Sequence, residues 1–577
     1  MEWTTPTTQL AALAALTLVS VDIIRRLIRN RIERKGCPLP PGPTPLPLIG
    51  SVLSVNTEEP FRTYTEWRAK YGDIMYIRLL DMDVVVLNSP SVASELLEKR
   101  SQIYSDRPFI ATVDSYGHDS TFAFANYGEH WKLCRRIFHQ TFRADAIATF
   151  HPMQLQKARQ MILSVMDDPS DYTSHYSTFA AAVTMCSVYD YDPSPRNDQM
   201  VSTINNFIDA SAVALMPERA VLLKVFPFCK GCSRSTASSD IVLVEVLHIP
   251  DWLPGSWIKH EARVARELGA KTVEAPYEYV QKRIQFKEDV NPSMVSDHIG
   301  HMEKLDGSHR SDYEKALKHT SMTAFLGRLL EQTISFLMTF TLAMVKNPRI
   351  WKSAQAEIDT IVGIDRLPEF DDRSSLPYVD AILRETLRWQ PPVPLGLPHA
   401  TRTSDIYNGF YIPKGISYRS MRPVRTDISS TGATVFGNVW AMSRDESRYP
   451  NAEQFLPERF LDAEGMLTDD IPNFVFGFGR RVCPGQYTAD ASLWIAMVTM
   501  LATFEFGHAK DVDGKDIAFE AKYLNGLARH PLTFPCCITP RTHMSKALFA
   551  IGDDVVKGGD FRDGPCRSNA EEYECSK

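Results

Sequence analysis

One ten-residue run near the C-terminal end of the chain contains the residues best suited to hold a metal. The run Phe476–Gly485 has the sequence FGFGRRVCPG, with a single cysteine among three glycines and two arginines. The thiolate is the metal-binding form of cysteine, and neighbouring cations lower the pKa that governs its formation. Glycines let a backbone approach a flat group closely, and N–H groups in such a turn can point at the sulfur and tune its electron donation. Cys483 is therefore the candidate metal ligand.

The same run resembles the haem-binding loop of the cytochrome P450 monooxygenases, whose pattern is Phe-x-x-Gly-x-Arg-x-Cys-x-Gly. The five fixed positions are filled by Phe476, Gly479, Arg481, Cys483 and Gly485. The resemblance implies that Cys483 is the axial ligand of the iron of heme b, and that the other four residues form part of the cofactor site. A thiolate ligand of haem donates electron density that favours oxygen activation. The alternative, a structural cysteine in a glycine-rich loop, leaves the further motifs below unexplained.

Residues 377–389 are predicted to form a helix that positions a charged pair. Pro377 suits the first helical position, and the apolar periodicity stops before Pro391. Glu385 and Arg388 are three residues apart and therefore share one face. Such a pair is usually solvated when it stands alone. The resemblance instead implies a structural brace, completed by Arg459 from a downstream meander at residues 455–460.

Trp131 and Arg135 are spaced by four residues, which places an indole N–H beside a guanidinium on one helix face. Both groups are hydrogen-bond donors without acceptor capacity. The resemblance implies that they bind the propionate carboxylates of haem. The alternative is a core tryptophan next to a surface arginine.

Residues 318–348 resemble the long helix that crosses the haem in this family. Its centre usually contains small residues followed by an acid and a hydroxyl, but here the sequence is Arg328-Leu329-Leu330-Glu331-Gln332-Thr333. Glu331 is the candidate acid and Thr333 a displaced hydroxyl for proton delivery. The alternative is that both are ordinary polar residues of a helix.

Two further segments resemble family elements after the cysteine. Residues 487–504 are predicted to form a buried helix, and residues 523–541 a C-terminal hairpin whose tip, at 524–527, contacts substrate. Residues 542–577 are polar and rich in glycine and acids, and are predicted to form a disordered tail.

Composition restricts the class of protein. The chain has 577 residues, of which 44% are hydrophobic, and a net charge of −7 without long charged runs, so a nucleic-acid partner is not expected. The ten cysteines are dispersed and show no disulfide framework, which favours a reducing compartment. Cys229 and Cys232 form an isolated C-x-x-C that lacks the second pair a zinc site needs.

The N-terminus has the features of a membrane anchor. Residues 10–24 are mostly apolar and are followed at once by arginines, which the positive-inside rule keeps in the cytosol. The stretch is short for a membrane span, and Asp22 leaves an amphipathic interfacial helix as the alternative. Residues 1–36 are thus expected to anchor the protein to the endoplasmic reticulum membrane as a single pass, with residues 37–541 as a cytosolic haem domain.

Two segments interrupt otherwise familiar sequence. Residues 231–247 and 416–432 are each 17 residues long, and each contains a hydroxyl residue followed by Asp-Ile. Our hypothesis is that both are retained introns of an uncorrected gene model. The alternative is that they are true surface loops, although the second is expected to split a β-strand beside the haem.

The resemblance implies the mainly helical P450 fold with a smaller β region, preceded by one anchor helix. The resemblance implies a monooxygenase that oxidises a lipophilic small molecule, with a terpenoid-like secondary metabolite favoured. No flavin or nicotinamide motif is present, so electrons are expected from a separate NADPH-cytochrome P450 reductase. The degraded long helix favours one alternative, an O2-independent haem-thiolate isomerase or dehydratase. The other alternative is an inactive haem protein.

Overall fold

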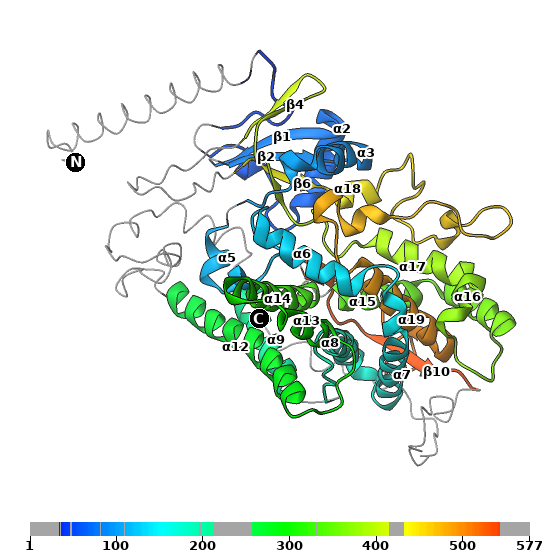
Figure 1. Ribbon diagram of the computed structural model, residues 1–577. Coiled ribbons are helices and arrows are strands. Elements are labelled where there is room, and N and C mark those ends of the chain that lie inside the picture. Colours follow the sequence, from blue (N-terminus) through cyan, green and yellow to red (C-terminus); the bar gives the residue numbers. More distant parts are fainter. Residues whose placement is uncertain are drawn as a thin grey trace, which may run out of the picture.

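Helices dominate the computed structural model of the chain (Figure 1). The structure describes residues 34–542 apart from 35, 47–48, 81, 109, 195–197, 213–256, 330–331, 415–431 and 525. The first helices are α2 (Pro60–Tyr71), α3 (Pro90–Ala93), α4 (Ser101–Tyr104), α5 (Ala111–Ser115), α6 (Glu129–Phe142), α7 (His151–Asp167), α8 (Tyr172–Tyr189) and α9 (Gln199–Ala212). The later helices are α12 (Trp257–Gln285), α13 (Met294–Met302), α14 (Gly307–Leu329), α15 (Gln332–Lys346), α16 (Pro348–Ile361), α17 (Pro377–Trp389), α18 (Val439–Ser443) and α19 (Gln486–Thr503).

The largest sheet in the described part of the chain has four strands in the order β1-β2-β6-β3. Its strands are β1 (Ile74–Leu79), β2 (Met82–Leu87), β3 (His399–Ala400) and β6 (Thr434–Gly437). β2 pairs antiparallel with β1 and parallel with β6. The sheet and α2 lie at one end of the molecule, and the helical body lies at the other (Figure 1).

Three two-stranded sheets complete the described strands. They are formed by β4 (Asp405–Tyr407) with β5 (Phe410–Ile412), β7 (Phe504–His508) with β10 (Cys536–Pro540), and β8 (Tyr523–Leu524) with β9 (His530–Pro531). The expected C-terminal hairpin therefore closes at β8 and β9, whereas β10 returns to pair with β7. The prediction of one hairpin over residues 523–541 was wrong in this respect, because β7 offers β10 a longer pairing edge than β9 does.

The main hydrophobic core surrounds α19 and α15. Every residue of α19 from Ala491 to Thr503 is buried, which explains why this helix is apolar on all sides. α17 begins with Pro377 in the first turn and ends at Trp389, as predicted. The prediction of a buried helix at residues 487–504 is confirmed within one residue at each end.

The predicted long helix corresponds to α14 and α15. The first of these begins at Gly307, eleven residues before the predicted start, and the second ends at Lys346. Glu331 lies between them, outside the described residues. No helix among those described is long and apolar enough to cross a membrane, and the predicted anchor lies almost wholly outside the described range.

The second interrupting segment does not split a strand. Residues before it form β5, which pairs with β4, and residues after it form β6, in the four-stranded sheet. The Ala433 N–H donates to the Lys414 carbonyl over 3.1 Å, so the chain leaves and returns at one point. The expectation of an interrupted strand was wrong because the flanking residues belong to different sheets. The first segment, 231–247, lies outside the described residues.

Candidate haem-thiolate site

The loop around Cys483 is closed by backbone hydrogen bonds. The Cys483 N–H donates to the Phe476 carbonyl over 2.8 Å, and the Val482 N–H donates to the Gly479 carbonyl over 3.1 Å. Gly485 then caps the N-terminus of α19. The thiol therefore lies just before the first turn of a buried helix, where the helix dipole favours negative charge.

Burial and polar contacts act on the Cys483 thiol in opposite directions. Burial raises its pKa, while a hydrogen bond from the Gly485 backbone N–H and the charge of Arg135 lower it. Arg135 thus lowers the thiol pKa, as expected of a nearby arginine, but burial outweighs it and the net shift for the free thiol is upward. A coordinated metal ion deprotonates such a thiol outright.

Gly479 is required by the shape of the loop. Its φ is +59°, and a Cβ atom there would lie 2.1 Å from the Leu97 carbonyl oxygen. A side chain at this position would force the loop away from the neighbouring backbone. This close approach lies between two protein segments, the cysteine loop and the backbone at Leu97.

Arg481 presents an unsatisfied buried donor. Its Nε donates to the Ser105 carbonyl over 2.9 Å and its Nη2 to the Ala125 carbonyl over 2.7 Å. Its Nη1 is buried without a hydrogen-bond partner among the described residues. Burial, and next the charge of Arg107, hold the pKa of Arg481 well below its usual value. A buried cationic donor without a partner is costly unless an anion pairs with it.

Helix α6 brings Trp131 and Arg135 to the same place. The guanidinium carbon of Arg481 lies 4.5 Å from the centre of the buried Trp131 ring. Arg135 Nη1 donates to the Val482 carbonyl over 2.7 Å, one residue before the candidate ligand. The structure thus places Trp131, Arg135, Arg481 and Cys483 around one centre.

Two residues of this cluster were missed by sequence reasoning. Arg107 donates to the Pro398 carbonyl over 2.6 Å, and burial lowers its pKa to about 10. His399 is buried and contacts the Tyr104 carbonyl over 2.9 Å; burial, then the charges of Arg107 and Arg481, lower its pKa to about 3. No spacing rule connects residues 107 and 399, which meet because β3 lies beside residue 106.

The chemistry of this donor set fits haem. Arg107 and Arg135 both lie close enough to Arg481 to lower its pKa, and Arg135 also acts on the Cys483 thiol. The two propionate carboxylates of haem would supply the negative charge that these three cations lack. The orphaned Arg481 Nη1 is the clearest single indication of an anionic partner.

The predicted brace residues are also in contact. Arg388 Nε and Nη2 donate to the two carboxylate oxygens of Glu385 over 2.6 and 2.8 Å, and neither side chain is exposed. Arg459 Nε lies 3.3 Å from Glu385 Oε1, and the Leu456 N–H donates to the same oxygen over 2.8 Å. The brace therefore joins α17 to the segment that leads to the cysteine loop.

Of the two predicted proton-delivery residues, the structure describes only Thr333. Thr333 lies in the first turn of α15 and is partly buried, whereas Glu331 lies outside the described residues. Leu524, at the predicted substrate tip, is 48% exposed.

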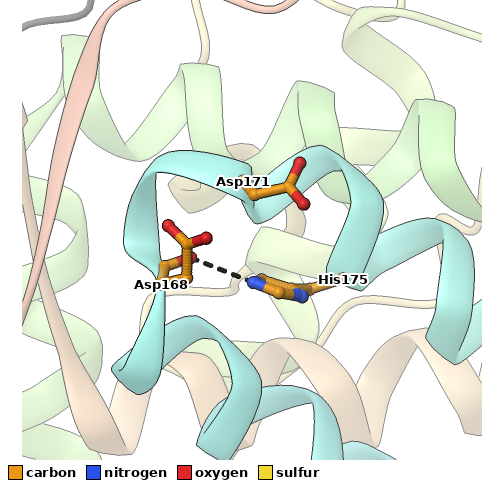
Figure 2. A group of neighbouring side chains, drawn as sticks. All are labelled: Asp168, Asp171 and His175. Atoms are coloured by element: carbon orange, nitrogen blue, oxygen red, sulfur yellow. Dashed lines mark hydrogen bonds between the residues drawn. The ribbon is translucent and has the colours of Figure 1, made fainter. Parts of the chain in front are cut away.

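A separate group of potential metal ligands lies between α7 and α8, where Asp168, Asp171 and His175 approach one another (Figure 2). His175 Nε2 contacts the Asp168 carbonyl over 3.0 Å, and the Ser170 hydroxyl donates to Asp168 Oδ1 over 2.6 Å. These contacts define the turn that begins α8. They explain why the three side chains lie close together without a metal ion.

Comparison with known proteins agrees with this geometry. The cytochrome P450 family model matches residues 40–418 and 429–538. Cytochrome P450 monooxygenase 176 of Postia placenta is 33% identical over 514 residues, covering 88% of this chain and 92% of the relative. Cytochrome P450 monooxygenase 136 of the same fungus is 30% identical over 550 residues, covering 94% and 96%.

A third relative extends the likeness to another fungus. Cytochrome P450 monooxygenase COX1 of Coprinopsis cinerea is 30% identical over 553 residues, covering 94% of this chain and 99% of the relative. With the thiol of Cys483 held in its loop beside Arg135, the chain belongs to the cytochrome P450 monooxygenase family, oxidoreductases that bind haem iron through a cysteine thiolate.

Proposed function

We propose that the protein oxidises a lipophilic small molecule with molecular oxygen, using heme b ligated by Cys483. The observation that supports this most directly is at the cysteine loop, where Arg481 Nη1 is buried without a partner among the described residues and the Arg481 guanidinium lies 4.5 Å from the Trp131 ring. When bound, haem supplies the oxygen activation and the substrate oxidation; the protein supplies binding and electrostatics.

The protein groups have distinct roles in this proposal. The Gly485 N–H and Arg135 stabilise the thiolate of Cys483, because both favour its charged form. Trp131, Arg135 and Arg481 would hold the propionates of bound haem as hydrogen-bond donors. The Glu385–Arg388–Arg459 brace holds the backbone before the cysteine loop in place.

Proton delivery is assigned to Glu331 and Thr333. Glu331 aligns with the family acid, and Thr333 is the hydroxyl next to the position at which the family has one. In this proposal Thr333 would relay a proton through a water toward the bound cofactor, with Glu331 as the source of the proton.

A second candidate function is supported by the same segment. Arg328, Leu329 and Leu330 replace the small residues that make room for oxygen in this family, and Gln332 replaces the usual hydroxyl. These substitutions favour an O2-independent haem-thiolate isomerase or dehydratase. An inactive haem protein is the third candidate.

Electrons are proposed to come from a separate NADPH-cytochrome P450 reductase. The outer face of α6 supports a docking role, because Lys132 and Arg136 are exposed there beside a surface pocket of about 330 Å³. Arg480, partly buried on the cysteine loop, extends this cationic face. An acidic reductase surface would be attracted to it.

The proposed location is the cytosolic face of the endoplasmic reticulum membrane. The apolar residues 10–24 followed by arginines support a single N-terminal pass, and a membrane enzyme gains access to lipophilic substrates there. Terpenoid-like secondary metabolites are the favoured substrate class.

Spectroscopy and turnover test the proposal together. The reduced protein with carbon monoxide should give the family's thiolate absorption band, and Cys483→Ser should abolish it. With purified reductase, product formation from a screened lipophilic ligand should require both NADPH and O2. Turnover without either co-substrate would establish the isomerase or dehydratase candidate instead, and absence of the band would establish the inactive one.

A further inference from the structure

Two histidines from different helices face each other. His130 of α6 and His319 of α14 have Nε2 and Nδ1 atoms 3.2 Å apart. Their rings are nearly perpendicular, with centroids 5.0 Å apart. In this arrangement the nitrogen of one ring points at the nitrogen of the other, and a single proton between them satisfies both.

The same separation suits two ligands of one metal ion. A zinc–imidazole bond is about 2.0–2.1 Å long, so two nitrogens of a tetrahedral site lie about 3.3 Å apart. The observed 3.2 Å is close to that value. A metal ion can replace the shared proton if each ring turns by about 35°, so that the two nitrogens converge on the ion instead of pointing at each other.

The protonation state of both rings suits ligation. Burial, followed by the charges of His130 and Lys315, lowers the pKa of His319 to about 4. Burial and Lys315 also lower the pKa of His130, against an opposing contribution from Asp312. Both imidazoles are therefore neutral near pH 7, which is the form that binds metals.

The helices that present the two rings are held together by other contacts. The Thr320 hydroxyl lies 3.4 Å from the Cys134 carbonyl, and the Cys134 thiol donates to the Ala316 carbonyl over 3.6 Å. Cys134 Sγ also lies 3.6 Å from His130 Nε2, but its S–H already has an acceptor in the Ala316 carbonyl. The framework is thus preformed, and the sulfur is not counted among the ligands.

We propose that His130 Nε2 and His319 Nδ1 bind one divalent transition-metal ion, with water completing its coordination. Imidazole ligands select zinc, copper or nickel over magnesium and calcium. The exposed side chain of His130 leaves the site accessible from solvent. A bound ion would link α6, the helix of Trp131 and Arg135, to α14.

Calorimetric titration of the haem-loaded full chain with ZnCl2 tests the proposal, using protein without a polyhistidine tag at pH 7.5. One zinc ion should bind, and His130→Asn and His319→Gln should each weaken that binding by about tenfold or more, because each removes a direct ligand. His309→Gln is the matched control, since His309 is an exposed histidine on the same helix. It should leave the affinity unchanged.

The group formed by Asp168, Asp171 and His175 is the alternative binding site for the zinc ion. If His175→Asn removes zinc binding while His130→Asn retains it, the proposal is overturned and the ion belongs between α7 and α8. Zinc should also raise the unfolding temperature of the parent protein, and should fail to raise it in His319→Gln. Each variant is first shown to retain the carbon monoxide band, so that a folding defect is not mistaken for a lost ligand.

Discussion

The carboxylate of Glu385 and the guanidinium of Arg388 form a two-point ion pair that solvent does not reach. The two residues are one turn apart on α17, and the remaining Arg388 nitrogen, Nη1, donates to the Ser443 carbonyl over 2.7 Å. One side chain therefore joins α17 to backbone 55 positions further along the chain. Interactions of this kind hold the surroundings of the cysteine loop together without touching the loop.

Arg388→Ala should destabilise the fold strongly. The substitution removes the two-point partner of the buried Glu385 carboxylate and leaves only Arg459, 3.3 Å away. Removing one partner of a buried ion pair lowers the free energy of unfolding by about 3–5 kcal/mol. Urea unfolding and haem content measure the loss. The control is Arg349→Ala, because Arg349 and Glu458 form a pair whose side chains are 67% and 39% exposed. That change should cost no more than about 1 kcal/mol; equal losses in the two variants would contradict the brace.

Gly479→Ala should disrupt the cysteine loop. The new Cβ would lie 2.1 Å from the Leu97 carbonyl oxygen, in addition to the strain of a φ of +59°. Gly465→Ala separates the two effects, because Gly465 has a φ of +80° with no atom within 4 Å of a Cβ. Gly465→Ala should lower the free energy of unfolding by about 1–2 kcal/mol, from backbone strain alone. Haem incorporation should fall in Gly479→Ala and stay normal in the control; haem retained fully by both would show that the loop has room to move.

Arg481→Met should accelerate haem loss. The substitution keeps most of the side-chain volume but removes the buried donor whose Nη1 we assign to a propionate. A hydrogen bond to a charged group contributes about 1.5–3 kcal/mol, which corresponds to a roughly 10- to 100-fold faster transfer of haem to apomyoglobin. Arg480→Met is the comparison, since Arg480 bonds to the Tyr127 hydroxyl instead. Equal haem loss in both variants would argue against the assignment.

Local signals explain what the sequence predicted well. α17 and α19 were placed because prolines, glycines and apolar periodicity define helix ends and buried faces within a few residues. Arg107 and His399 escaped notice because their contact depends on a bridge between residues 106 and 400, which no local pattern encodes. The strand beside the second interrupting segment was placed wrongly for a related reason, since β5 and β6 have only three and four residues.

Stability should decline as the pH falls from 7 toward 4, in part through His298. Burial, and next the charge of His301, lower the pKa of His298 to about 4, below the ordinary value of about 6.5 in the unfolded chain. The unfolded state therefore binds the proton first as the pH falls. Between the two pKa values, each pH unit lowers the free energy of unfolding by about 1.4 kcal/mol through this residue. The Tyr313 hydroxyl, 2.7 Å from Nδ1, is the donor that protonation would displace.

His298→Asn isolates that contribution, because the asparagine oxygen can still accept from Tyr313. Between pH 4.5 and 6, the slope of unfolding free energy against pH should be smaller than in the parent by about 1.4 kcal/mol per pH unit, which corresponds to one proton. His309→Asn, at an exposed position, should leave the slope unchanged. An unaltered slope in His298→Asn would mean that His298 titrates normally in the folded protein.

Removal of residues 416–432 should leave a folded haem protein. The Lys414 carbonyl and the Ala433 N–H already meet at 3.1 Å, and the family match is interrupted at 419–428, inside the same segment. A Cβ at Gly432 would lie 1.8 Å from the Thr401 carbonyl oxygen, so a glycine is needed just before Ala433. The shortened chain keeps one there, because deletion joins Gly415 to Ala433.

The shortened protein should therefore keep the carbon monoxide band, with a free energy of unfolding within about 1 kcal/mol of the parent, as polymer scaling of loop closure predicts. Changing its junction glycine to alanine should reduce haem incorporation, because the new Cβ would strike Thr401. A collapsed deletion variant would show that the segment belongs to the fold. A mature transcript that encodes the segment would refute the retained-intron hypothesis, and tolerance of the deletion would then identify a true surface loop.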